Sequence, residues 1–93
     1  MGKHTILGFS TVARKWREAY QQCDIGDSFD KVLSLAGEPD EVLDLGDTVI
    51  YTYVSDEWKG IARGGTIYRK MTFVVKNDKI YSKTSQNLDR VAG

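Results

Sequence analysis

The chain has 93 residues and a mass of 10.5 kDa, which suffices for one hydrophobic core but not for two domains. Its 41% hydrophobic and 28% charged residues are typical of a folded domain and exclude a disordered chain. Because 13 Lys and Arg residues balance 13 Asp and Glu residues, no net charge attracts a polyanion, and we expect no nucleic-acid partner.

Two amphipathic helices are predicted in the first part of the chain. Residues 11–23 carry apolar side chains three and four positions apart, with Trp16 in the middle of the stripe, so Trp16 is expected in the core. A second helix is expected from residue 27 or 28 to residue 36. Ser28 can cap its first turn, and Gly37 can take the left-handed conformation that ends it.

After Pro39 the apolar period changes to two, and β-branched and aromatic residues dominate, which predicts an antiparallel meander of three or four strands. The expected strands are residues 42–45, 48–55, 66–75 and 79–84, with a loop over 56–65 and a tight turn over 76–78. The predicted fold class is α+β, with two N-terminal helices packed on one face of the sheet. Residues 11–84 are expected to form this single domain, between a flexible N-terminus (1–10) and a frayed C-terminal tail (85–93).

Alternation along the strands assigns a covered face and an open face to the sheet. The covered face is expected to hold Val49, Tyr51, Tyr53, Met71, Phe73, Val75 and Ile80. The opposite parity places Tyr68, Lys70, Thr72 and Val74 on one face with Tyr81 and Lys83. Tyrosines and β-branched residues on an uncovered face favour a binding surface. Two alternatives stay open: cross-strand pairs that only stabilise an exposed sheet, and a second copy of the chain that closes the face in a homodimer.

The loop over 56–65 is the second candidate binding element, because Trp58 and Arg63 lie in it among glycines. Trp58 is equally consistent with a side chain folded back over the edge of the core. The predicted partner-binding residues are therefore Trp58, Arg63, Tyr68, Lys70, Tyr81 and Lys83.

Between residues 25 and 80 an apolar residue and a glycine precede a capped helix that ends in Gly-x-Pro, and an aromatic-x-Tyr strand and a strand ending in Phe before a turn follow. The residues of this pattern are Ile25, Gly26, Val32, Gly37, Pro39, Tyr51, Tyr53, Phe73 and Ile80. The pattern resembles the signature of the SmpA/OmlA (BamE-like) family of small bacterial lipoprotein domains. The same helix–helix–sheet unit occurs in tandem in β-lactamase inhibitory proteins, which look similar in fold. The resemblance implies a module that binds a protein partner without catalysis.

Catalytic, metal and cofactor sites are not expected. The lone histidine, His4, precedes the first helix, and Cys23 is expected to be a buried hydrophobe, so no nucleophile and base are paired by the sequence. There is no Cys/His cluster for zinc, and the glycines fit no phosphate-binding spacing. A small enzyme stays an alternative if a pocket gathers Cys23, His4 and a carboxylate. An inhibitor that inserts its loop or sheet face into an enzyme cleft is a further alternative.

The compartment depends on the N-terminus. No apolar run reaches the roughly 20 residues that cross a bilayer, so no membrane span is expected. The residues before Cys23 are Tyr20-Gln21-Gln22, not the lipid-attachment motif of the resembling family, and lipidation is not expected. The first ten residues also lack the apolar block of a signal peptide. We expect a bacterial cell-envelope protein if a signal was removed, and a cytoplasmic protein otherwise.

Overall fold

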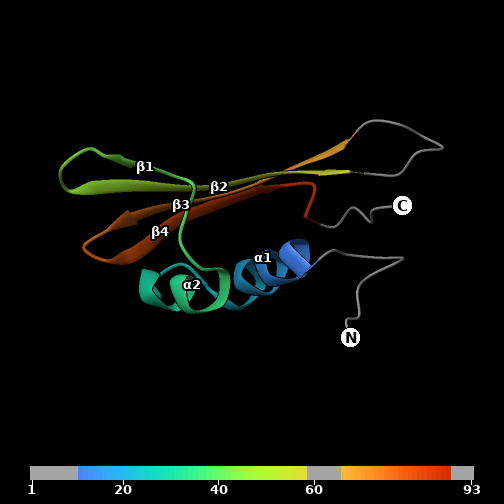
Figure 1. Ribbon diagram of the computed structural model, residues 1–93. Helices are drawn as coiled ribbons and strands as arrows, with labels where there is room; N and C mark the ends of the chain where they lie inside the picture. The colour runs from blue at the N-terminus through green and yellow to red at the C-terminus, as the bar shows by residue number, and fades with distance from the viewer. Residues whose placement is uncertain (1–10, 59–65, 89–93) are drawn as a thin grey trace.

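The computed structural model describes residues 11–58 and 66–88, with the side chains of 14–55 and 68–88. Two helices precede a four-stranded antiparallel sheet in the order β1-β2-β3-β4. Both helices lie against the same face of the sheet, and no other element of the described residues covers the opposite face (Figure 1). The predicted α+β class, with N-terminal helices on one face of a meander, is confirmed. The predicted flexible N-terminus, 1–10, lies outside the described residues.

The helices begin and end close to where the sequence placed them. Helix α1 spans Thr11–Gln22 and helix α2 spans Phe29–Ala36. The Ser28 side chain accepts a hydrogen bond from the Asp30 N–H at 3.2 Å, which satisfies one free donor at the start of α2. Gly37 ends α2 with φ of 84° and donates its N–H to the Leu33 carbonyl at 2.9 Å, so a side chain there would strain the backbone.

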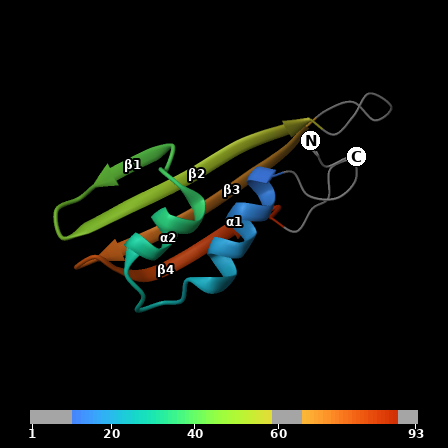
Figure 2. The same ribbon diagram turned by 60° about the horizontal axis from the view of Figure 1, so that its bottom comes forward.

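The strands are β1 (Glu41–Asp44), β2 (Thr48–Trp58), β3 (Thr66–Lys76) and β4 (Lys79–Gln86). Strands β2 and β3 pair over their whole length, from Thr48 opposite Lys76 to Trp58 opposite Thr66, and form the longest ladder of the sheet (Figure 2). The prediction that a loop begins at residue 56 was therefore wrong, because pairing with β3 extends β2 to Trp58. Asn77 and Asp78 join β3 to β4 with φ of 53° and 64°, the positive values that a two-residue hairpin turn requires.

The core lies between the helices and the covered face of the sheet. Trp16 contacts Tyr53 edge-on, with ring centroids 5.7 Å apart, and Phe29 stacks on Tyr51 at 3.9 Å. The residues that form this core are Trp16, Ala19, Cys23, Phe29, Val32, Ala36, Tyr53, Met71, Phe73, Val75, Ile80 and Leu88. The expected burial of Trp16, Cys23 and Phe73 is confirmed.

The C-terminal end of the described chain is packed, which corrects the expected frayed tail from residue 85. Strand β4 continues to Gln86, and Leu88 is only 5% exposed. Asn87 turns the chain with φ of 61°. Its side-chain Nδ2 donates a hydrogen bond to the Tyr68 carbonyl at 2.6 Å, and its backbone carbonyl accepts one from Arg69 Nη1 at 2.6 Å. These bonds hold Leu88 over the end of the core. Residues 89–93 lie outside the described residues.

Candidate functional site

A β-bulge between β3 and β4 decides which side chains share the open face. Val75 lies opposite Ile80, but Val74 lies opposite Ser82, so Tyr81 is an extra residue on β4. One extra residue reverses the alternation of every later position in the strand. Lys83 therefore lies opposite Phe73, which is fully buried under the helices.

Lys83 serves the covered face rather than the open one. Its Nζ donates to the carbonyl oxygens of Tyr20 at 2.5 Å and Cys23 at 2.9 Å, at the C-terminal end of α1. A cation there satisfies free carbonyls and opposes the helix dipole, and α1 has no basic residue in its own last turn. The prediction that Lys83 faces a partner beside Tyr81 was wrong, because strict alternation does not anticipate a bulge.

The open face carries an apolar row across three strands. Leu43 lies opposite Ile50, and Ile50 lies opposite Val74. Thr52, Thr72 and Thr84 form the adjacent row, followed by Val54 opposite Lys70. We define the open face as Glu41, Leu43, Thr48, Ile50, Thr52, Val54, Tyr68, Lys70, Thr72, Val74, Lys76, Lys79, Ser82, Thr84 and Gln86. Its centre is rich in β-branched residues, and its charged residues lie toward the margins.

Two tyrosines that the sequence predicts as partner-binding residues lie on the side of the open face. Tyr68 is 41% exposed and shares the parity of Lys70 on β3. Tyr81, at the bulge, is 59% exposed, and the Nζ of the open-face residue Lys76 lies 4.2 Å from its ring centroid. The structure thus brings Tyr68, Lys70 and Tyr81 to one side of the sheet. Trp58 ends β2, and its side chain lies outside the described part, as does all of Arg63.

The exposed edge at β1 is a feature that the sequence analysis missed. All four residues of β1 are exposed, and Val42, Leu43 and Leu45 keep 57%, 55% and 58% of their surface accessible. Carboxylates flank them on both sides, since residues 38–47 include Glu38, Asp40, Glu41, Asp44 and Asp47 but no Lys or Arg. The available signal was this acidic run around three large aliphatic residues.

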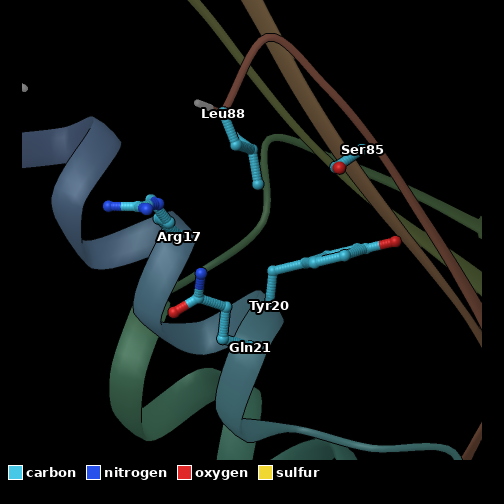
Figure 3. Close-up of a pocket in the computed structure, with 5 residues that line it drawn as sticks. All are labelled: Arg17, Tyr20, Gln21, Ser85 and Leu88. Atoms are coloured by element: carbon cyan, nitrogen blue, oxygen red, sulfur yellow. The ribbon is translucent and has the colours of Figure 1, made fainter. Parts of the chain in front are cut away.

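A pocket of about 210 Å³ lies between α1 and the end of β4 (Figure 3). Tyr20 and Leu88 form its apolar part, and Arg17, Gln21 and Ser85 form its polar rim. Small-molecule sites usually measure about 300 to 1,000 Å³, so this pocket is small for a substrate. It does not include Cys23, and His4 lies outside the described residues.

Two buried side chains, Cys23 and Tyr53, have raised pKa values, and the cause in each case is first of all burial. Burial raises the pKa of the Cys23 thiol above its ordinary value, which disfavours the reactive thiolate. Burial, followed by the charges of Glu38 and Asp40, raises the pKa of the Tyr53 hydroxyl. That hydroxyl donates to the Gly37 carbonyl at 2.7 Å, so it fixes the end of α2 against β2.

Family models, curated proteins and solved structures gave no match to this chain. Among residues 11–58 and 66–88, no group of His, Cys, Asp and Glu side chains is placed to hold a metal ion. Neither helix in that part of the chain has the length and apolar character needed to cross a membrane.

Proposed function

We propose that this chain is a protein-binding module without catalytic activity, and that it binds a partner protein through the open face of its sheet. The observation that carries the proposal is the row Leu43–Ile50–Val74, which neither helix covers. An antiparallel sheet with one solvated face normally alternates apolar and polar positions. Here the centre of the second face is formed by Leu43, Ile50 and Val74 and a row of threonines, with exposed tyrosines beside it.

The side chains of this face suit a protein partner in size and chemistry. Tyr68 and Tyr81 offer rigid aromatic surface with a polar tip, the type of residue that most often dominates interface energies. Lys70 and Lys76 give the face a cationic margin on β3, which suits carboxylates on the partner. The resemblance to the SmpA/OmlA family supports the same role, since it implies a domain that acts by binding.

Site-specific photo-crosslinking tests whether the open face is the contact surface. A benzophenone amino acid replaces Tyr68 on the open face, and in a control protein it replaces Glu18, which is exposed on α1. Irradiation in the native cells should give a discrete adduct from position 68 and none from position 18. Equal adducts from both positions, or none from either, would contradict the proposal. An adduct of twice the 10.5 kDa chain mass would show that the face closes a homodimer instead.

A variant series then measures the contribution of the tyrosines against the captured partner. Tyr68→Ser and Tyr81→Ser should each weaken binding by about 2 kcal/mol if they are hot spots, with the melting temperature nearly unchanged because both side chains are exposed. Glu18→Gln is the matched surface control. If the double variant unfolds while its folded fraction binds normally, the tyrosines are structural, and the interaction lies elsewhere.

A further inference from the structure

Strand β1 is an open edge of the sheet. It stands first in the strand order and pairs only with β2 within the described residues, and both views place it at the margin of the sheet (Figures 1 and 2). The opposite edge differs, because the segment before α2 pairs with the start of β4: Gly26 N–H donates to the Ile80 carbonyl, and Ile80 N–H donates to the Asp27 carbonyl, both at 2.8 Å. The fold thus protects part of its β4 edge and leaves the β1 edge accessible.

The register determines which backbone groups of β1 point outward. The Leu45 N–H donates to the Thr48 carbonyl at 2.8 Å, so Leu45 belongs to a hydrogen-bonded pair with β2. In an antiparallel ladder such pairs alternate along the strand, which turns the backbone of Leu43 toward β2 and the backbones of Val42 and Asp44 away from it. The N–H and C=O groups of Val42 and Asp44 are therefore positioned to pair with another strand.

The side chains of β1 form a short, symmetric pattern of charge. In chain order Glu41, Val42, Leu43 and Asp44 read as anion, apolar, apolar, anion. On the neighbouring strand β2, residues 48–55 carry no charged side chain. The nearest cation on the next strand, β3, is Lys76, which lies opposite Thr48 at the first residue of β2. The carboxylates of Glu41 and Asp44 thus remain the dominant charges of this edge.

The acidic run around β1 disfavours pairing with a second copy of the strand. A copy that paired through the outward backbones of Val42 and Asp44 would bring residues 38–47 of two chains together, each with five carboxylates and no Lys or Arg, and like charges at close range repel. Charges on an edge strand commonly prevent such self-pairing. A strand that reads cation, apolar, apolar, cation would instead match every position, and because the pattern is symmetric it would match in either direction.

We propose that the β1 edge binds an extended partner segment of the pattern cation–apolar–apolar–cation by strand addition. The added backbone pairs with Val42 and Asp44, its apolar residues pack against Val42 and Leu43, and its cations neutralise Glu41 and Asp44. This site goes beyond the proposed function, because it uses the edge of the sheet rather than its open face. The two sites meet at Glu41 and Leu43, which belong to both.

Peptide titration of the isotopically labelled full chain tests the proposal. The probe is acetyl-Thr-Lys-Val-Val-Lys-Thr-amide, and the matched controls are the same peptide with Glu in place of Lys and the same peptide with both valine amides N-methylated. At about 1 mM the lysine peptide should shift the amide signals of Val42 and Asp44 and slow their hydrogen exchange. Each control should bind at least about tenfold more weakly. No effect on these two amides, or equal binding of the N-methylated peptide, overturns strand addition.

Variants of the edge separate backbone pairing from charge. Val42→Pro removes the outward N–H and should abolish binding, whereas Val42→Thr keeps it and should bind normally; Val42 is exposed, so both should fold. E41Q/D44N should lose the preference for lysine over glutamate and the weakening by added salt. Asn at position 44 retains an oxygen for the Gly46 N–H, which Asp44 Oδ1 now accepts at 2.9 Å. Normal binding by Val42→Pro would refute the site. Tyr68→Ser should not change peptide binding, so failure of this proposal is distinguishable from failure at the open face.

Discussion

Tyr20 and Lys83 each donate a hydrogen bond to the backbone carbonyl of the other, although 63 residues separate them along the chain. The Tyr20 hydroxyl donates to the Lys83 carbonyl at 3.3 Å, while Lys83 Nζ donates to the Tyr20 carbonyl and lies 4.4 Å from the Tyr20 ring centroid. The pair fastens the end of α1 to β4. It exists because the bulge at Tyr81 turns Lys83 toward the helices.

Replacing Lys83 by Met should destabilise the fold by about 1.5 to 3 kcal/mol, because hydrogen bonds from a charged donor to the α1 carbonyls are lost. Lys79→Met, at an exposed position of the same strand, is the control and should change stability little. Urea unfolding curves measure both. Equal midpoints for the two variants would mean that the end of α1 does not depend on Lys83.

Truncating Phe73 to Ala should cost about 3 to 5 kcal/mol of unfolding free energy, since the ring is fully buried between Phe29 and Tyr53. The neighbouring Val74, on the open face, is only half-buried, and Val74→Ala should cost about 1 kcal/mol. Thermal or urea melts of the two variants test the assignment of the faces. If Val74→Ala cost more than Phe73→Ala, the core would lie on the face that is here assigned as open.

Leu88→Ala should cost about 2 to 5 kcal/mol, because Leu88 is buried in the core despite its position after β4. Gln86→Ala, at an exposed position two residues earlier, should stay within about 0.5 kcal/mol of the wild type. Urea unfolding distinguishes a packed chain end from a frayed one. A Leu88 variant as stable as the Gln86 variant would restore the frayed-tail interpretation.

Cys23 should resist alkylation in the folded protein. Its side chain is inaccessible, and burial raises the pKa of the thiol above the ordinary value, so at pH 8 little thiolate forms and the reagent has no access to it. Iodoacetamide labelling followed by mass spectrometry should show slow modification in buffer and rapid modification in urea. Rapid labelling without denaturant would indicate a reactive thiol and reopen the question of catalysis.

Asp27 gives the stability a pH dependence on the acid side. The Asp24 N–H, which donates to Asp27 Oδ2 at 2.9 Å, and then Lys31 at 3.3 Å hold the pKa of the carboxyl below its ordinary value. A group whose pKa is lower in the folded state stabilises above the unfolded pKa, and this contribution disappears as the pH falls through the folded pKa. Asp27→Asn should therefore be less stable than the wild type at pH 7, and the difference should vanish in strong acid. Urea midpoints measured from neutral pH to pH 2 check it; a constant difference would contradict the assignment.

The sequence by itself determined the local structure of this protein. The spacing of Trp16 and its neighbours, the cap at Ser28 and the stop at Gly37 are local signals, and each acts within a few residues in the folded chain. The change to a period of two after Pro39 likewise predicted the meander and the burial of Phe73. Such features depend on backbone sterics and on the burial of one face, and both can be inferred from the local order of residues.

Tertiary structure alone decided the composition of the candidate sites. The bulge at Tyr81 sends Lys83 to α1, and the turn at Asn87 returns Leu88 to the core. The exposed edge at β1 likewise follows from the place of β1 at one end of the strand order. None of these has a local cause, because each results from pairing and packing between segments far apart in sequence, where long-range contacts override the pattern of a single strand.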